Sequence, residues 1–246
     1  MNSSGFHIII PARYQSTRLP GKLLMDIAGQ SVIERVYRQA VQAKPASITI
    51  AADNDKIADH VSNFGAEVIM TSVDHPTGTD RLAEVISRKG FGDDDIIVNV
   101  QGDEPFIAPA LITQVANMIA GSDAPVATLC WPIEKFEQLH NPNVVKVVRD
   151  QFNQALYFSR SAIPAHRDEP DSIRNSFRHI GLYAYRAGFV KQFVNLPPCV
   201  IEHCEALEQL RVLWSGYKIR VDIACAPPQQ DINTLEDLEH ARFLHR

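Results

Sequence analysis

The segment 96–100 (IIVNV) is a run of mainly β-branched residues, and it limits the possible folds more than any other part of the sequence. A strand that lacks alternating polar residues has to bury both of its faces, which is typical of a parallel sheet covered by helices on both sides. Parallel neighbours are joined by long crossover connections, usually helices. The chain should therefore place helices between its strands.

The first half of the chain shows this alternation. Apolar runs typical of strands alternate with segments whose apolar residues recur at helical spacing. We predict strands at 7–10, 47–52, 67–71 and 96–100, and helices at 31–41, 55–64, around 82–86 and at 109–120. Connected by right-handed crossovers, these elements form an α/β fold, a three-layer α/β/α sandwich with a mostly parallel sheet.

The pattern changes beyond about residue 125, where strands become more frequent than helices. The predicted elements there are strands at 144–148, 155–158, 180–185 and 219–225, a polar loop at 164–178, and helices at 202–214 and after Thr234, which caps the last helix together with Asp237. The sequence contains neither an internal repeat nor a low-complexity linker. We therefore assign residues 1–246 to a single domain.

Composition argues against several classes of protein. The formal net charge of −5 is unlike that of a nucleic-acid-binding or basic membrane-binding protein. No apolar stretch approaches the roughly 20 residues of a membrane span, and the segment 6–11 is too short for a signal-peptide core, so we expect a cytoplasmic protein. Cys130, Cys199, Cys204 and Cys225 lack CxxC spacing. Buried, reduced thiols are expected there rather than zinc or disulfides.

The loop after the first strand concentrates positive charge. In IIIPARYQSTRLPGK (8–22), Arg13, Arg18 and Lys22 appear without an acidic residue, and the first acid of the chain is Asp26. Ligands of open α/β sheets bind at the carboxyl ends of the strands, where this loop lies. Arginine forks and a lysine ammonium suit polyphosphate oxygens. The loop is interpreted as a polyphosphate site, with a solvated basic loop as the alternative.

Two common phosphate-binding loops do not fit this segment. A Walker A loop requires Ser or Thr after Gly-Lys and an earlier Gly, whereas Leu23 follows Lys22 and Ser16 stands at the earlier position. No G-x-G-x-x-G follows any predicted strand, which argues against a dinucleotide-binding Rossmann site.

The central strand ends in VNVQGDEP (98–105). Gly102 lets the chain turn, and Asp103 and Glu104 follow at the same edge of the sheet as the cationic loop. A carboxylate facing a phosphate site usually indicates a divalent cation between the two. The alternative is a helix N-cap, because Asp favours that position and Pro105 suits a helix start.

Together these segments resemble the sugar-activating cytidylyltransferases, and among them the enzymes for the eight-carbon acidic sugar 3-deoxy-manno-octulosonate (Kdo). The resemblance is carried by PARYQSTRLPGK, TGTDR (77–81) and NVQGDEP, and extends over nearly the whole chain through NPNVVKVV, ALYFSR, RHIGLYAYR and EALEQLRVLW. It implies the nucleotide-diphospho-sugar transferase-like fold with a smaller, β-rich subdomain inserted at 126–200. That subdomain would carry sugar contacts and a homodimer interface.

The resemblance also implies a reaction and its site. CTP and Kdo would give CMP-Kdo and pyrophosphate, with Mg²⁺, for lipopolysaccharide synthesis, and Lys22, Asp103 and Arg13 would be catalytic. The nucleotide would contact Ala12, Arg13, Ser16, Arg18, Lys22, Thr79 and Arg81. The sugar would contact Gln101, Arg160, His179, Tyr183, Glu208 and Gln209.

Alternatives remain for four of the sugar residues. Arg160 would hold the sugar carboxylate, since a guanidinium matches a planar anion, but it could instead form a surface ion pair. His179 could be a hydrogen-bonded structural residue. Glu208 and Gln209 are neighbours on a predicted helix and diverge by about 100°. Only one of the two is expected to point into the pocket.

One departure from the family pattern concerns the metal. The family reads Gly-Val-Asp-Thr near the C-terminus, with that Asp as a metal ligand, whereas Asn233 stands there in DINT and Asp231 replaces the Gly. Asp231 lies two residues away on an extended segment and would face the same side. We therefore expect Asp103, Asp231 and Asn233 to bind the metal together. A second departure, Ala165-His166 in place of an aromatic pair, makes the sugar contacts of that loop harder to assign.

Two other functions fit parts of the sequence. The enzyme could act on another acidic sugar, such as an 8-amino analogue of Kdo or a sialic acid, although ALYFSR and RHIGLYAYR favour Kdo over sialic acid. Asn233 also raises the alternative of a degenerate nucleotide-binding protein without activity. The presence of Arg13, Lys22 and Asp103 argues against it.

Overall fold

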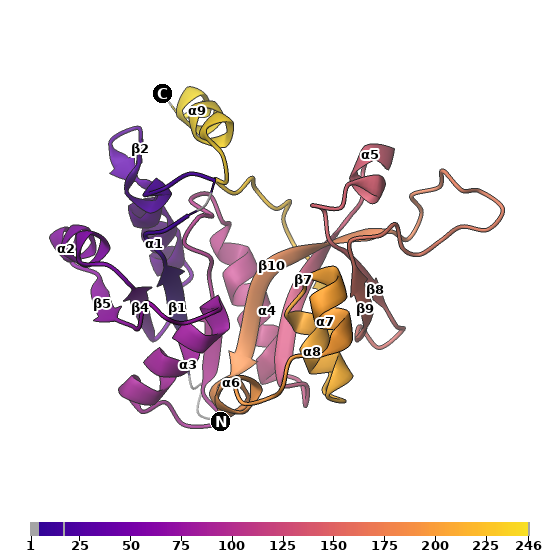
Figure 1. Ribbon diagram of the computed structural model, residues 1–246, viewed down its shortest axis with the longest axis horizontal. Coiled ribbons are helices and arrows are strands. Elements are labelled where there is room, and N and C mark those ends of the chain that lie inside the picture. The colour runs from indigo at the N-terminus through magenta and orange to yellow at the C-terminus, as the bar shows by residue number, and fades with distance from the viewer. Residues whose placement is uncertain (1–4, 17, 246) are drawn as a thin grey trace.

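The computed structural model describes residues 5–16 and 18–245, and it contains a large sheet with helices on both faces (Figure 1). Seven strands follow one another across this sheet in the order β11 (Ile219–Ile223), β7 (Val126–Pro132), β10 (Phe177–Arg186), β6 (Ile96–Asn99), β1 (His7–Ala12), β4 (Ser47–Ala52) and β5 (Glu67–Met70).

Most neighbouring strands are parallel. β1 pairs in parallel with β4 and β6, β4 with β5, and β11 with β7, whereas β10 is antiparallel to β6 and β7. The IIVNV run forms β6, and all four residues of this strand are buried. The mixed, mostly parallel sheet confirms the predicted fold class.

Strand β1 shows how the sheet divides the core in two. Ile8 and Ile10 pack into the core made with α1 (Val32–Gln42) and α4 (Pro109–Ala120), whereas Ile9 packs into the core made with α3 (Gly78–Lys89) and α6 (Ala187–Phe193). All three isoleucines are fully buried. Burying an isoleucine contributes about 1.5–3 kcal/mol. Because both faces are apolar, polar groups collect at the strand ends.

Local sequence signals define several helix ends, including the predicted cap at Thr234. Ser31 caps α1 by accepting a hydrogen bond from the Glu34 amide, and α2 (Asp55–Asn63) is followed by Gly65 with a positive φ of 76°. Gly90 ends α3 in the left-handed conformation. Thr234 and Asp237 form a reciprocal capping box at the start of α9 (Leu235–Leu244).

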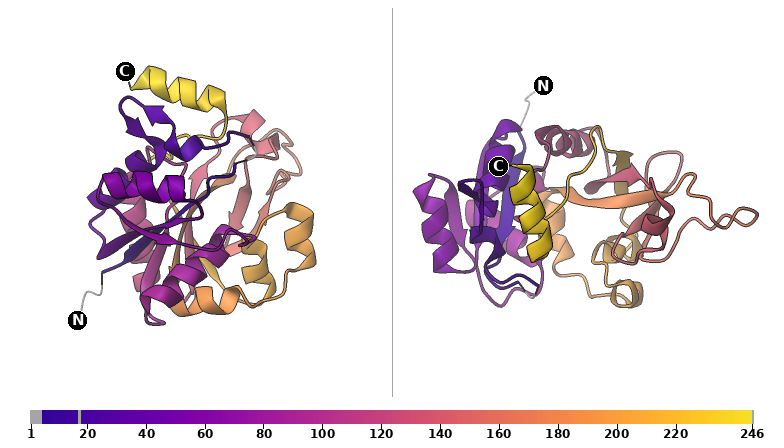
Figure 2. Two further views of the ribbon diagram at one scale, coloured as in Figure 1. Left: turned by 60° about the vertical axis from the view of Figure 1, so that its left-hand side comes forward. Right: turned by 90° about the horizontal axis from the view of Figure 1, so that it is seen from above.

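The region 126–200 combines main-sheet strands with a peripheral hairpin. β7 and β10 belong to the main sheet, while β8 (Lys146–Arg149) and β9 (Ala155–Ser159) form a hairpin that pairs with the first part of β10. The segment 160–176, without helix or strand, projects from that end of the molecule (Figures 1 and 2). A separate subdomain over 126–200 stays a prediction, as does its role in a dimer.

Six short elements were not predicted from the sequence. They are β7, α6, α5 (Phe136–His140), the 3₁₀ helix η1 (Lys22–Leu24), and the two-residue strands β2 (Asp26–Ile27) and β3 (Gln30–Ser31). Their apolar patterns are too short to distinguish a strand from a helix.

The helix predicted at 202–214 is wrong in one respect. Two helices, α7 (Val200–Glu205) and α8 (Gln209–Trp214), are separated by Ala206, which is left-handed at φ 49°. The carbonyl groups of Glu205 and Ala206 accept hydrogen bonds from Arg160, at 2.6 and 3.2 Å. A distant side chain therefore binds carbonyl groups that a continuous helix would use internally.

The prediction of four buried thiols is correct for Cys130 and Cys199 and wrong for Cys204 and Cys225, which are exposed. The exposed pair lies on α7 and just beyond β11, where the chain meets solvent. All four are free cysteines. Among the described residues, no helix has both the length and the apolar character needed to cross a membrane.

Candidate active site

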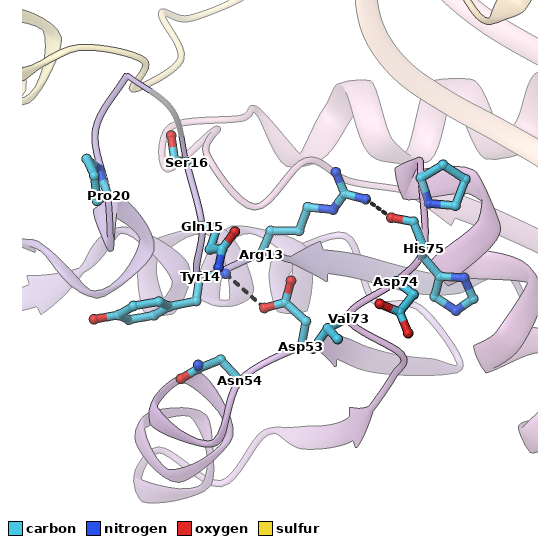
Figure 3. Close-up of a pocket in the computed structure, with 11 residues that line it drawn as sticks. Arg13, Tyr14, Gln15, Ser16, Pro20, Asp53, Asn54, Val73, Asp74 and His75 are labelled. Atoms are coloured by element: carbon cyan, nitrogen blue, oxygen red, sulfur yellow. Dashed lines mark hydrogen bonds between the residues drawn. The ribbon is translucent and has the colours of Figure 1, made fainter.

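Three adjoining cavities follow the carboxyl ends of the parallel strands. The first, about 840 Å³, lies between the loop after β1 and the residues after β4 and β5 (Figure 3). It shares Arg13, Gln15 and Ser16 with a second cavity of about 370 Å³. The second shares Gln101 and Asp103 with a third of about 550 Å³. Shared walls join the three into one groove.

A close backbone approach brings two of the predicted segments together. β1 lies beside β6, so the loops that follow both strands start at the same edge. At Gly102 an added Cβ atom would lie 2.8 Å from the carbonyl oxygen of Pro11, closer than such atoms approach. Glycine at this position therefore lets the QGDEP turn contact the cationic loop.

Lys22 and Asp103 meet at the centre of the groove. The Lys22 ammonium lies 2.6 Å from Oδ2 of Asp103 and 2.8 Å from the carbonyl oxygen of Ile232. Oδ1 of Asn233 is 3.4 Å from the same nitrogen and accepts a hydrogen bond from Arg18 at 2.7 Å. The structure thus brings together the cationic loop, the central strand end and the DINT segment.

The oxygen atoms around Lys22 fit the predicted metal ligands. Asn233 directs Oδ1 toward Lys22 and Arg18, while its amide nitrogen donates to Asp231. Asp103 and Asp231 both line the third cavity. Among the described residues, no group of three or more His, Cys, Asp or Glu side chains could hold a metal ion by itself. Mg²⁺ commonly binds only one or two carboxylates and takes its other ligands from substrate phosphates. Asp103, Asp231 and the Asn233 carbonyl oxygen fit a site of that kind.

The other predicted nucleotide residues differ in position. Arg13 donates to the carbonyl oxygen of His75 and lies along the first cavity (Figure 3). Ser16 and Arg18 line the second cavity. Ala12 is fully buried at the end of β1. Thr79 donates a hydrogen bond to Glu208 at 2.9 Å instead of facing the groove.

Arg81, which was predicted to contact the nucleotide, does not line the groove. Its side chain is fully buried, donates to the Thr71 hydroxyl and lies 3.3 Å from Oδ2 of Asp53. Burial lowers the pKa of Arg81. Oδ1 of the same aspartate accepts a hydrogen bond from the Tyr14 amide at 2.9 Å. Arg81 therefore holds Asp53, and Asp53 positions the cationic loop.

The third cavity gathers four of the predicted sugar residues, namely Gln101, His179, Tyr183 and Gln209. Glu208 is turned away and accepts hydrogen bonds from Thr77 and Thr79. Burial raises the pKa of Glu208. Of the two neighbours Glu208 and Gln209, only Gln209 lines this cavity, which agrees with the expected divergence.

Arg160, which was predicted to hold a sugar carboxylate, does not line the third cavity. Nη1 donates to the Pro142 carbonyl at 2.9 Å, and Nε and Nη2 bind the carbonyl groups between α7 and α8. Each of its three nitrogens therefore donates one hydrogen bond to the backbone. Arg160 fixes the position of the chain before Gln209.

Burial changes the protonation of several groups in the third cavity. It lowers the pKa of His179 to about 3, so the ring is neutral and shares a hydrogen bond of 3.0 Å with the Thr128 hydroxyl. Burial, with Asp103 and Asp231 nearby, raises the pKa of Glu104 to about 8. Burial also raises the pKa of Tyr183. The His179 ring and the Glu104 carboxyl group are therefore mainly uncharged at neutral pH.

Two residues of the site were not selected from the sequence. Asp53 follows β4, and the rule that ligands bind at the carboxyl ends of strands could have identified it. Arg178 lines the third cavity and lies directly before His179 in RHIGLYAYR, a segment quoted above without a role for its first residue.

Comparisons with known proteins agree with this geometry. The profile of the family described as cytidylyltransferase matches residues 7–219. A 3-deoxy-manno-octulosonate cytidylyltransferase of Legionella pneumophila (strain Lens) is 63% identical over 236 residues, covering 96% of this chain and 94% of the relative. One from Vibrio vulnificus (strain CMCP6) is 52% identical over 244 residues, covering 97% of each.

Solved structures show the same fold. A CMP:2-keto-3-deoxy-manno-octonic acid synthetase complexed with CTP superposes with a TM-score of 0.90 at 40% identity, covering 98% of each chain. A 4-diphosphocytidyl-2C-methyl-D-erythritol synthase gives a TM-score of 0.67 at 14% identity over 99% of each chain. At 14% identity, the similarity to the erythritol synthase shows a shared fold and nothing about function.

The neutral state of His179 predicts a pH effect on stability. The pKa of His179 in the folded protein lies below the value of about 6.5 that it has in an unfolded chain. Between these two pH values the unfolded chain binds a proton at His179 and the folded protein does not. The free energy of unfolding therefore falls as the pH falls. We expect His179→Gln to reduce this loss between about pH 7 and pH 5, by up to roughly 1 kcal/mol per pH unit. Urea unfolding at several pH values measures it. The exposed His140→Gln should match the wild type, and equal slopes for His179→Gln would contradict a neutral His179.

Proposed function

This chain belongs to the cytidylyltransferase family, and we propose that it transfers CMP from CTP to the anomeric hydroxyl of 3-deoxy-D-manno-octulosonate, releasing pyrophosphate. The product, CMP-Kdo, serves lipopolysaccharide biosynthesis. Relatives with this activity in their names align over nearly the whole chain. The observation that carries the proposal is the meeting of Lys22 and Asp103 where the second and third cavities join. The reaction belongs to the cytoplasm, because a nucleoside triphosphate does not cross a membrane unaided.

Each cavity of the groove suits one part of the substrates. The first cavity accepts the nucleoside, beside Tyr14 and Asn54. The second places the triphosphate between Arg13, Arg18 and Lys22. The third accepts the sugar, whose hydroxyl groups can bond the side-chain amides of Gln101 and Gln209.

The chemistry is mainly positioning and charge neutralisation. The anomeric hydroxyl attacks the α-phosphorus and pyrophosphate leaves in line, so negative charge spreads over the phosphate oxygens. Lys22 neutralises this charge, and the arginines orient the leaving group. Asp103, Asp231 and the Asn233 carbonyl oxygen would hold Mg²⁺, which supplies further charge neutralisation when bound.

Pyrophosphate release tests the proposed reaction. With CTP, Mg²⁺ and Kdo, the protein should release pyrophosphate, and Lys22→Met should lower kcat by about 100- to 1000-fold because a phosphate-binding charge is lost. Lys218→Met, at an exposed position away from the groove, should retain wild-type activity.

Two results would count against this function. Nucleotide binding without pyrophosphate release would indicate the inactive alternative. A higher kcat/KM for the 8-amino analogue or a sialic acid than for Kdo would assign a different acidic sugar.

If Asp231 is a metal ligand, its removal should weaken Mg²⁺ binding. Asp231→Ala removes a carboxylate beside Asn233, so the Mg²⁺ concentration that gives half-maximal turnover should rise about 10- to 100-fold. The exposed Asp123→Ala removes the same charge elsewhere and should leave this concentration unchanged. An unaltered Mg²⁺ requirement in Asp231→Ala would leave Asp103 and Asn233 as the protein ligands.

A homodimer is proposed through the β8–β9 hairpin and the edge strand β11. Phe152 and Leu156 on the hairpin are 68% and 59% exposed, and Ile223 on β11 is 40% exposed. A bridge between Gln154 and Arg220 holds these elements side by side. Adjacent exposed apolar side chains commonly mark protein interfaces.

Sedimentation velocity should give the mass of two chains. Leu156→Glu should shift it to the mass of one chain by placing a charge in the interface. Leu244→Glu, at an exposed position on α9, should not. A wild-type monomer would exclude the dimer.

A further inference from the structure

The third cavity has one strongly basic side chain. Among the described residues that line it, Arg178 is the only Arg or Lys, and His179 beside it is neutral. The acidic residues Asp103 and Asp231 line the same cavity. An acidic sugar entering this cavity would meet repulsion unless a positive group receives its carboxylate. The cavity offers Arg178 for that purpose.

The other cations near this end of the sheet are already bound. Lys22 contacts Asp103, Arg160 binds three backbone carbonyl groups, and Lys146 is fully buried with its ammonium 3.0 and 2.6 Å from the carbonyl oxygens of Asn141 and Arg160. These donors hold the walls of the groove in place.

Arg178, by contrast, has unused hydrogen-bonding capacity. Its side chain is half-buried near the start of β10, and within the described chain it forms neither a hydrogen bond nor an ion pair. Its electrostatic neighbours are Glu134 and Asp231. An arginine stays charged in a protein, so the five N–H donors of this guanidinium are free to bind an anion.

We propose that Arg178 binds the carboxylate of the acidic sugar and selects for it, the role that the sequence assigned to Arg160. This inference rests on the proposed function of the groove. Arg178 is anchored in β10, where Phe177 and Arg178 pair with Val147 and Lys146 of β8, so its Cα position is fixed before the sugar arrives. The planar guanidinium can form two parallel hydrogen bonds with a carboxylate.

Steady-state kinetics with both substrates tests this role. Arg178→Gln should raise the KM for Kdo roughly 10- to 100-fold, as expected for a lost charge-assisted bond, and change the KM for CTP by less than about twofold. Arg178→Lys should restore part of the loss, because it keeps the charge without the fork. Arg38→Gln, exposed on α1, is the matched control, and thermal melting checks that each variant folds.

A substrate analogue separates carboxylate recognition from a structural effect. The wild type should prefer Kdo to its C1 carboxamide, and Arg178→Gln should lose most of this preference. If Arg178→Gln kept the preference, or changed the Mg²⁺ requirement instead of the KM for Kdo, Arg178 would be a counter-ion of Asp231 and the proposal would be overturned. A wild type inactive with Kdo would refute the proposed function itself, which distinguishes the two failures.

Discussion

The contact between Lys22 and Asp103 is the interaction on which the rest of the site depends. It joins the loop after β1 to the end of β6 and, through the Ile232 carbonyl group, to the segment before α9. These segments are far apart in the chain, and the parallel pairing of β1 and β6 brings the first two to one edge. A charge pair that is largely shielded from water is stronger than one at the surface. The phosphate-binding and sugar-binding halves of the groove are therefore connected at one point.

A second group of charged residues supports the walls of the groove. Arg81 holds Asp53, which holds the cationic loop through the Tyr14 amide, and Arg160 holds the turn before Gln209. Each of these contacts restricts the motion of a segment that lines the groove, which is how supporting interactions orient a binding site.

The sequence predicted the features that depend on local chemistry. The IIVNV strand and the Thr234 cap follow from patterns within a few residues, and the structure contains both. The cationic loop and QGDEP could be placed together because parallel strands end at one edge. The orientation of Arg81 and Arg160 could not be predicted, since their partners include Asp53 and carbonyl groups 18 to 46 residues away. The break at Ala206 was missed for the same reason.

The close approach at Gly102 has a consequence for the shape of the groove. At its centre two stretches of main chain lie close together, one near the end of β1 at Pro11 and one just after β6 at Gly102. Side chains can rotate to admit a larger ligand, but a backbone packed against a backbone resists such adjustment. The aperture between nucleotide and sugar is therefore nearly constant, and differences in ligand size have to be accommodated at the two outer cavities.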